Sequence, residues 1–302
     1  MSKPTIYIVS DGKPGHLAQS DGLAEAIGRL IEINIEQVEL KWIHVTKRAK
    51  PYPKGNGLIL AAGRNACVLA RDMKKQFGLP AIALMNPGWL NRKRFDLCVI
   101  PRHDGIAESD KIIVTEGALN GLVASTNALV SEGLMLIGGP SKHHAWDSDA
   151  IGKQLTTILE RDPQMRWTVT GSRRTPDSTD RLLHDLAKQF GDRFAYTPAS
   201  QTPRGWVAEQ LARCGVCWVS EDSVSMVYEA LTAGARVGLL RVPRKGKPGR
   251  VVRGVQSLVD RGWVTSFDQW QDGQLLSNDR EPLAEADRVA KLVLERFPAL
   301  TQ

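Results

Sequence analysis

The stretch "VSEDSVSMVYEALTAGARVGLL" (219–240) reads as a strand, an acidic turn, a helix, a glycine turn and a second strand. Both strands are short and continuously apolar, which is typical of strands buried on both faces of a parallel sheet. Comparable strand–helix units recur along almost the whole chain. The order of elements therefore predicts an α/β protein built from βαβ units.

The series of strand–helix units occurs twice along the chain. The first set of predicted strands covers 5–10, 37–45, 57–63, 81–86, 97–101 and 111–117, and the second covers 134–139, 166–172, 194–198, 216–220 and 236–242. Helices are predicted at 64–77, 147–161, 177–190, 203–213, 223–233 and 281–297. Two Rossmann-like domains follow, 1–125 and 126–280, with a linker near 120–133; the C-terminal helix in 281–302 could cross back to the first domain.

Composition narrows the function classes. The chain of 302 residues has a net charge of +7 and a pI near 9.3, which favours acidic partners such as nucleotides, nucleic acid or anionic membrane surfaces. Its apolar runs are too short to span a bilayer, and no signal segment is recognisable, so a cytoplasmic protein is expected. Cys214 and Cys217 form a CxxC without a second pair, which indicates buried structural cysteines and no metal site.

The basic charge is concentrated in "RVPRKGKPGRVVR" (241–253), which holds six basic residues and no acidic one. Such a run is usually a solvated loop, and the alternative is an anion site. The opening stretch "VSDGKPGHLAQSDGLAEAI" (9–27) superficially resembles a phosphate-binding loop. Lys13 is followed by Pro14, however, so the hydroxyl of a P-loop is missing, and the glycines do not fit a dinucleotide-binding turn.

A nucleotide site is predicted in the second half. Asp222 and Ser223 stand where a helix N-cap is expected, and capping alone would explain both. The same helix amides, with the Ser223 and Ser225 hydroxyls, would also suit a diphosphate. Glu229 lies one turn further along an apolar helix, where a carboxylate can accept bonds from two ribose hydroxyls. Capping does not explain Glu229.

Further polar groups follow neighbouring strands. Arg173 and Arg174 come directly after the strand at 166–172, and Gly138 and Gly139 end the strand at 134–139. Ligands of open α/β sheets bind outside the carboxyl ends of the strands. Guanidinium groups suit phosphate oxygens, and glycines permit close backbone approach.

These segments together carry a family resemblance. "SDGKPGH", "AAGR" (61–64), "IGGPSKHH", "VTGSRRTP" and "SEDSVSMVYEA" resemble the mitochondrial-fission family of plants and its bacterial relatives. The plant factor recruits a dynamin-type GTPase, and the bacterial relatives look like glycosyltransferases. The resemblance implies the GT-B fold, in which two Rossmann-like domains face a central cleft.

"GKPGH" and "SMVYEALTAGARVGLL" are also similar to segments of the lipid-linked N-acetylglucosaminyltransferase of peptidoglycan synthesis. That similarity puts Glu229 on the ribose-binding glutamate. It makes Gly12, Lys13 and Gly15 an acceptor-side loop and not a nucleotide loop. Lys13-Pro14 and Arg236 depart from that enzyme, so its acceptor is not carried over.

The predicted reaction is glycosyl transfer from a nucleotide-diphosphate sugar, without cofactor or metal. Helix amides at 223–225 and Arg173 or Arg174 would stabilise the leaving diphosphate. His16 is the predicted general base, with Asp11 and Asp104 as alternates. Asp147-Ser148-Asp149 has the form of a metal-binding DxD motif but reads better as a helix start.

Two other functions stay open: a non-catalytic interaction scaffold, and a sugar-nucleotide epimerase of the same fold. Nucleic acid is not an expected partner, because no recognition helix or aromatic-rich strand motif is present. A lipid or cell-envelope acceptor would imply peripheral membrane association. "WLNRKR" (89–94) is the candidate surface, unless Trp89 and Leu90 are buried below a turn.

Overall fold

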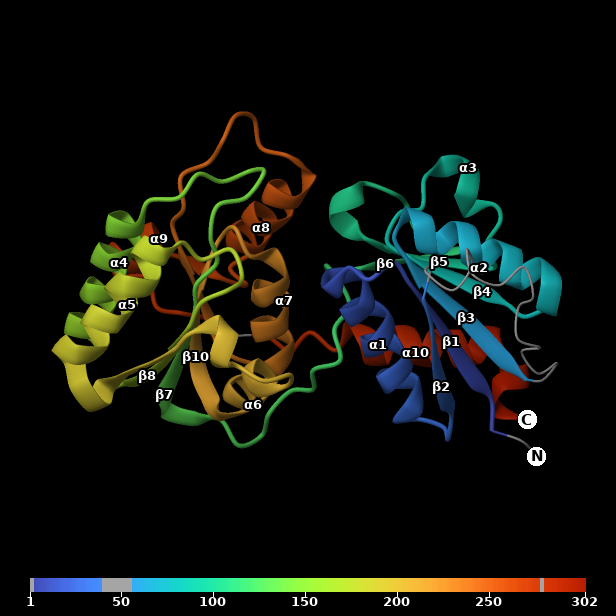
Figure 1. Cartoon of the computed structure of the whole chain (residues 1–302), viewed down its shortest axis with the longest axis horizontal. Coiled ribbons are helices and arrows are strands. Elements are labelled where there is room, and N and C mark those ends of the chain that lie inside the picture. The colour runs from blue at the N-terminus through green and yellow to red at the C-terminus, as the bar shows by residue number, and fades with distance from the viewer. Residues whose placement is uncertain (1–2, 40–55, 278–279) are drawn as a thin grey trace. The chain divides into compact units, whose positions relative to one another are not determined.

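The computed structural model describes residues 3–39, 56–277 and 280–302 (Figure 1). Contacts divide the chain into two compact units, Met1–Gly121 with Ala284–Gln302, and Leu122–Leu283. Each unit contains a six-stranded sheet whose named strands pair in parallel. The predicted α/β class, with two Rossmann-like domains, is confirmed.

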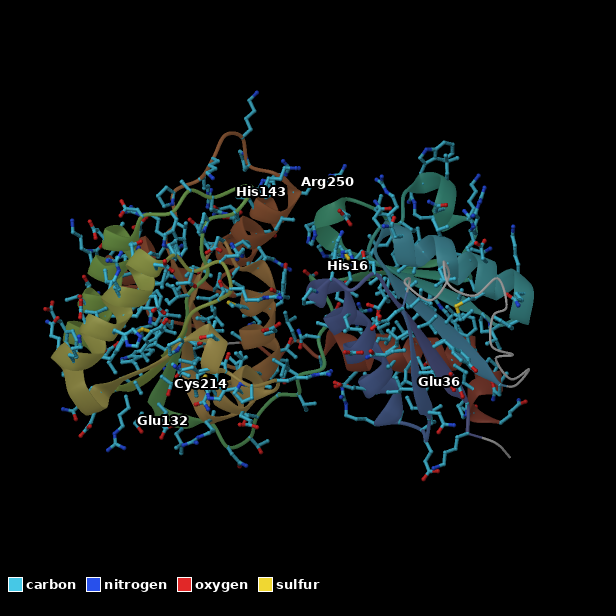
Figure 2. The ribbon with its side chains drawn as sticks, viewed as in Figure 1. His16, Glu36, Glu132, His143, Cys214 and Arg250 are labelled. Carbon is cyan, nitrogen blue, oxygen red and sulfur yellow. The ribbon has the colours of Figure 1, made fainter. Side chains whose placement is uncertain are left out.

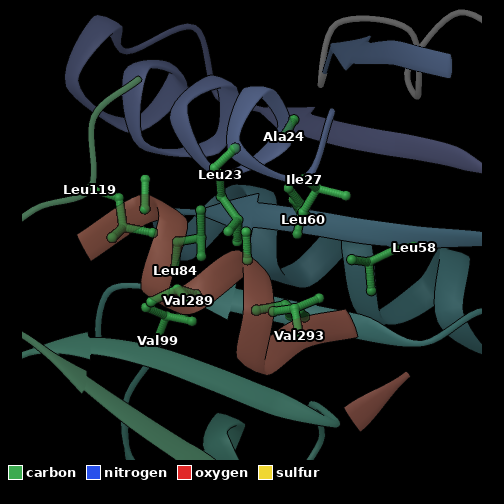
Figure 3. Close-up of a cluster of buried hydrophobic side chains, with 14 of the residues drawn as sticks. Leu23, Ala24, Ile27, Leu58, Leu60, Leu84, Val99, Leu119, Val289 and Val293 are labelled. Atoms are coloured by element: carbon green, nitrogen blue, oxygen red, sulfur yellow. The ribbon is translucent and has the colours of Figure 1, made fainter. Parts of the chain in front are cut away.

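The first unit has the strand order β2-β1-β3-β4-β5-β6. Its elements are β1 (Thr5–Ser10), α1 (Pro14–Gly28), β2 (Asn34–Glu39), β3 (Gly57–Ala62), α2 (Arg64–Phe77), β4 (Ala81–Leu84), α3 (Trp89–Arg92), β5 (Leu97–Pro101), β6 (Ile112–Thr115) and α10 (Glu285–Arg296). Figure 3 shows α1 and α10 over one face of the sheet, with Leu23, Leu60 and Val289 in the shared core. The C-terminal helix therefore completes the core of the first unit.

The sequence of α2 explains its bounds and its buried face. Ala66, Ala70 and Met73 recur at helical spacing and are buried against the sheet. Gly78 adopts a φ of 70° and its amide donates to the Lys74 carbonyl, which ends the helix. The predicted helix at 64–77 is confirmed.

The second unit has the strand order β12-β11-β10-β7-β8-β9. Its elements are β7 (Leu129–Leu136), α4 (Ser148–Arg161), β8 (Arg166–Thr170), α5 (Asp177–Phe190), β9 (Phe194–Thr197), α6 (Trp206–Arg213), β10 (Cys214–Ser220), α7 (Val224–Ala233), β11 (Arg236–Leu240), α8 (Arg250–Asp260), β12 (Thr265–Ser266) and α9 (Phe267–Gln271). Asp147 accepts the Ala150 amide at 3.0 Å and caps α4, so the acidic triplet is a helix start as predicted.

In each sheet the order of strands reverses beside the unit's first strand. β1 lies between β2 and β3, and β7 lies between β10 and β8. Loops that leave such a pair of strands diverge, which opens a crevice at their carboxyl ends where open α/β sheets bind ligands. The loops at these two points begin at Asp11 and Gly63 in the first unit, and at Ile137 and Glu221 in the second.

Several elements differ from the prediction. β7 begins at Leu129, so residues 129–133, predicted as linker, are strand; most of them are exposed, and the apolar run starts only at 134. β2 begins at Asn34, and the predicted strand residues 40–45 lie outside the described part of the chain. The prediction missed α8, β12 and α9. The prediction of a basic loop at 241–253 is therefore wrong for residues 250–253, because α8 begins at Arg250.

The exposure of individual side chains tests two expectations, one for the cysteines of the CxxC and one for Trp89 and Leu90. Cys214 and Cys217 are buried in β10 as free thiols, and burial raises the pKa of Cys217 well above 9.0. Trp89 and Leu90 are 66% and 62% exposed, so the alternative that they are buried below a turn is wrong. None of the helices in the described residues is long and apolar enough to cross a bilayer.

Candidate functional site

A buried carboxylate, Asp222, is the centre of a polar network at the carboxyl end of the second sheet. It lies in the acidic turn between β10 and α7, and its side chain is fully buried. Oδ2 accepts the Gly139 amide at 3.1 Å and the Ser223 hydroxyl at 3.2 Å, and lies 2.8 Å from Nη2 of Arg174. The network therefore joins the loops that follow β7, β8 and β10.

Arg174 is the bridge between these loops. Its Nη1 donates to the carbonyl oxygens of Gly139 at 2.7 Å and Pro140 at 3.1 Å, and its Nη2 donates to the Ser223 hydroxyl at 2.9 Å. The side chain is still 41% exposed. Each Nη already has two acceptors among the described residues, so the donor left for a ligand is Nε–H. Arg173 is exposed and makes no hydrogen bond or ion pair with the described residues.

Gly138 and Gly139 permit this close approach. A Cβ at Gly138 would overlap the Asp222 carboxylate and the Ser223 hydroxyl, and one at Gly139 would overlap the main chain of Arg174. Three loops thus meet where no side chain fits. The space beside both glycines is occupied by the chain itself, and contact of Gly139 with a nucleotide stays a prediction.

The start of α7 is not capped by a side chain. Ser223 is the N-cap residue, yet its hydroxyl bonds with Asp222 and Arg174 and accepts no helix amide. Capping as the role of Asp222 and Ser223 is therefore wrong. The amides of Val224 and Ser225 have no acceptor within the described residues, and an anion could take them.

Glu229 lies one turn beyond Ser225 on α7 and is partly buried. Burial raises the pKa of its carboxyl from 4.5 to about 7. Among residues 3–39, 56–277 and 280–302 nothing forms a hydrogen bond or ion pair with this group. Burial of an unpartnered carboxylate is costly, and hydroxyl donors of a ligand would offset that cost.

Three residues that the sequence analysis missed hold the loops together. Ser220 Oγ accepts the Gly138 amide at 2.7 Å, and Thr175 Oγ1 donates to the Gly138 carbonyl at 2.6 Å. Glu221 accepts the Val242 amide at 3.0 Å and so ties the acidic turn to the loop after β11. Their common signal is a polar residue in or directly beside a turn at a strand's carboxyl end.

Two buried polar atoms of this region have no hydrogen-bond partner in the part of the chain that the structure describes. They are Oδ1 of Asp222 and Nε2 of His144, a histidine that is only 3% exposed. Burial lowers the pKa of His144, although Glu221 and Asp222 act in the opposite direction. Buried polar atoms are normally satisfied, so both atoms point to a water or ligand group here.

The first unit holds a carboxylate–imidazole pair. Nδ1 of His16 lies 3.0 Å from both oxygens of Asp11, and the two side chains are 20% and 5% exposed. Burial alone would raise the pKa of Asp11, but hydrogen bonds from His16 and the Lys13 amide lower it overall. A proton on Nδ1 donated to Asp11 leaves Nε2 as a proton acceptor.

The loop "DGKPGH" positions this pair. Gly12 has a φ of 76° and donates its amide to the Ser10 hydroxyl at 3.0 Å, and Pro14 starts α1, so that His16 falls in its first turn. Gly63, after β3, leaves room for the imidazole, because a Cβ there would overlap Nδ1.

Of the remaining predicted residues, Lys13 Nζ lies 3.7 Å from Asp11, and Gly15 borders open space. Asp104 lies in a 3₁₀ turn (Arg102–Asp104) after β5, which β3 and β4 separate from β1 in the sheet. Within the described ranges, no group of three or more His, Cys, Asp or Glu could hold a metal ion.

The chain is similar in fold to several solved structures. The "putative UDP-N-acetylglucosamine 2-epimerase" of Listeria monocytogenes has a TM-score of 0.59 and 10% identity, covering 98% of this chain and 97% of its own. The S. aureus MnaA–UDP co-structure has a TM-score of 0.50 and 12% identity, covering 100% and 98%. A glycosyltransferase of Rickettsia africae ESF-5 has a TM-score of 0.47 and 9% identity, covering 99% and 96%.

No curated protein sequence matches the chain. The sequence model described as Mitochondrial fission ELM1 matches residues 14–297, which is nearly the full length. The chain therefore belongs to the mitochondrial fission ELM1 family.

Proposed function

We propose that this protein is a glycosyltransferase that uses a nucleoside diphosphate sugar without a metal ion. The observation that carries the proposal is the uncapped start of α7 beside Arg174, with the unpartnered Glu229 one turn further on. Helix amides and a guanidinium suit a diphosphate, and a carboxylate suits ribose hydroxyls. One helix thus offers both halves of a nucleotide site.

In the proposed reaction, the acceptor hydroxyl oxygen attacks the anomeric carbon and the bond from that carbon to the diphosphate oxygen breaks. The leaving diphosphate gains negative charge, which the amides of Val224 and Ser225 and the Arg174 guanidinium stabilise. The acceptor proton passes to Nε2 of His16, while Asp11 holds the imidazole through Nδ1. Asp222 positions Arg174.

The donor base is proposed to be uracil, since one neighbour of similar fold is a UDP co-structure. An epimerase of this fold would use the same nucleotide site, and a scaffold protein would need none of it. The intact set of Arg174, Ser223 and Glu229 supports an active nucleotide site over a scaffold.

Calorimetric titration with UDP, GDP, ADP and CMP tests the proposal, with Glu229→Ala as the comparison variant. One nucleoside diphosphate should bind the wild type and bind the variant at least ~10-fold more weakly. Incubation with the matching nucleotide sugars then separates transfer from epimerisation by the product formed. If none of the four binds, the proposal is wrong.

A further inference from the structure

The segment after β4 displays two large apolar side chains to solvent. Trp89 and Leu90, at the start of α3, are 66% and 62% exposed. A turn holds them in place, because Gly88 has a φ of 91° and donates its amide to Oδ1 of Asn86 at 3.0 Å. Single apolar residues on a surface need no explanation, whereas contiguous ones mark a site of interaction.

The outer face of α2 continues this surface. Arg64, Val68, Arg71 and Lys75 follow one another at intervals of three or four residues, so they share one face of the helix. The buried residues of α2 are on the opposite face, and Val68 is 46% exposed. Nη1 of Arg71 lies 3.5 Å from Oδ1 of Asn91 in α3, and Figure 1 shows α3 beyond α2 in the first unit. The two helices therefore form one surface.

Positive charge surrounds the apolar side chains. Residues 64–94 hold seven basic side chains and one acidic side chain, Asp72. Lys74 pairs with Asp96 at 2.7 Å, and Arg71 lies 3.9 Å from Asp72. Four further cations are exposed and pair with no carboxylate of the described residues: Arg64, Lys75, Lys93 and Arg94. The charge of this surface therefore suits an anionic partner.

The surface begins at the edge of the sheet that carries the Asp11–His16 pair. α2 follows β3 and α3 follows β4, so both helices start at carboxyl ends of strands, as α1 does after β1. Arg64 directly follows Gly63, whose missing Cβ leaves room for the His16 imidazole. Figure 2 shows His16 at this edge, at the start of α1. A partner on the surface therefore meets the same edge of the sheet as the pair.

We infer that a basic–apolar patch docks the first unit on an anionic lipid bilayer. The patch consists of Arg64, Val68, Trp89, Leu90, Lys93 and Arg94. Tryptophan favours the boundary between head groups and acyl chains, and leucine and valine bury apolar surface there. Each lysine or arginine near an anionic bilayer strengthens binding by about 5-fold.

A bilayer accounts for more of the patch than nucleic acid does. A nucleic acid would pair with the cations and stack on Trp89, but it offers no apolar phase for Leu90 and Val68. A bilayer provides both the anionic head groups and the apolar phase. The inference does not depend on the proposed function, because the nucleotide site belongs to the other unit.

Flotation of the full chain with lipid vesicles tests the inference. In about 100 mM salt, partition onto phosphatidylcholine vesicles with about 30% phosphatidylglycerol should be at least ~10-fold stronger than onto pure phosphatidylcholine. Lys93→Gln/Arg94→Gln should weaken partition onto the anionic vesicles by ~20-fold, since two cations are lost. Trp89→Ser/Leu90→Ser should weaken it by at least ~10-fold, since the apolar contact is lost.

Two variants of the second unit are the matched controls. Lys153→Gln/Arg166→Gln removes one exposed lysine and one exposed arginine, and Val130→Ser/Leu275→Ser removes two side chains that are 75% and 82% exposed. Both should partition like the wild type. Thermal unfolding of every variant shows that the fold is kept.

Fluorescence quenching tests insertion directly. Anionic vesicles with brominated acyl chains should quench part of the tryptophan emission of the wild type, and this part should be lost in Trp89→Phe, which keeps an apolar ring. Quenching that persists in Trp89→Phe overturns the inference.

The flotation results can also overturn it. They do so if the protein binds neither kind of vesicle, if it binds both equally, or if the Lys93/Arg94 variant binds like the wild type. Equal losses in that variant and the Lys153/Arg166 control would show attraction by overall charge only, which contradicts a defined patch. Binding of a single-stranded oligonucleotide through the same residues, without binding to vesicles, would make the patch a nucleic-acid site instead.

Discussion

The guanidinium of Arg174 lies 2.8 Å from the carboxylate of Asp222, whose side chain is fully buried while that of Arg174 is 41% exposed. The two side chains differ in exposure, because the Asp222 carboxylate is in the interior and the Arg174 side chain extends to the surface. Asp222 thus fixes a cation at the carboxyl end of the sheet, where a ligand can meet it.

Arg174→Ala should destabilise the second unit by about 2 kcal/mol, because Asp222 would keep only neutral donors in a buried position. Urea unfolding at pH 7 measures this. Arg173→Ala is the stability control, since Arg173 is exposed without a partner in the described structure, and it should change stability by less than about 0.5 kcal/mol. Equal effects of the two variants would show that the buried pair is not stabilising.

Glu229→Gln should change the pH dependence of stability. The pKa of Glu229 is raised in the folded state from 4.5 to about 7, so the folded protein favours the protonated carboxyl. Its contribution is fully present below pH 4.5 and is lost as the pH rises through 7, a loss of about 3 kcal/mol.

The variant should therefore match the wild type near pH 4.5 and be more stable at pH 8 in the absence of ligand. Thermal unfolding across pH 4.5 to 8 measures the difference. A constant offset between the two proteins at every pH would contradict the raised pKa.

The α/β class and most element positions could be predicted, because apolar strands and glycine-ended helices are local signals. The residues at 129–133 were missed since exposed strand residues lack an apolar pattern. α8 was missed because basic residues and Gly254 hid the spacing of its buried Val252, Val255 and Leu258.

The residues of the candidate site also fall into two groups, those with a local signal in the sequence and those without one. Glu229 and the arginines stood out, because charged residues on apolar helices or after strands are locally visible. The role of Ser223 did not, since its choice of Arg174 over the helix amides depends on a loop 49 residues away in sequence. Contacts of that kind arise only when the sheet brings strand ends together.

Asp11→Asn tests whether His16 acts as the proposed base. The asparagine NH₂ group would donate to Nδ1, so the ring proton would move to Nε2 and no acceptor would remain there. Release of nucleoside diphosphate from the donor should slow by ~10²–10⁴-fold, with nucleotide affinity unchanged. Asp104→Asn is the comparison, and a rate loss there in place of Asp11→Asn would make Asp104 the base.

Gly63→Ala examines the same pair through its packing. The new Cβ would overlap Nδ1 of His16 and displace the imidazole from Asp11, so the turnover rate should fall by at least ~10²-fold. Both Gly63 and Gly78 have positive φ at the ends of α2, but a Cβ at Gly78 meets no atom within 4 Å. Gly78→Ala therefore places an alanine at positive φ at the other end of α2, at a cost of about 1 kcal/mol, without touching the histidine. Gly63, at φ 90° and ψ 156°, lies in a region that is essentially restricted to glycine, so its backbone strain as alanine is larger.

Both glycine variants should lose stability in thermal unfolding, Gly63→Ala more than Gly78→Ala, whereas only Gly63→Ala should lose turnover. Nucleotide affinity, measured by calorimetry, should stay at the wild-type value in both, because α7 and Arg174 belong to the other unit. If Gly78→Ala slowed turnover as much as Gly63→Ala, the loss would come from the helix and not from the position of His16.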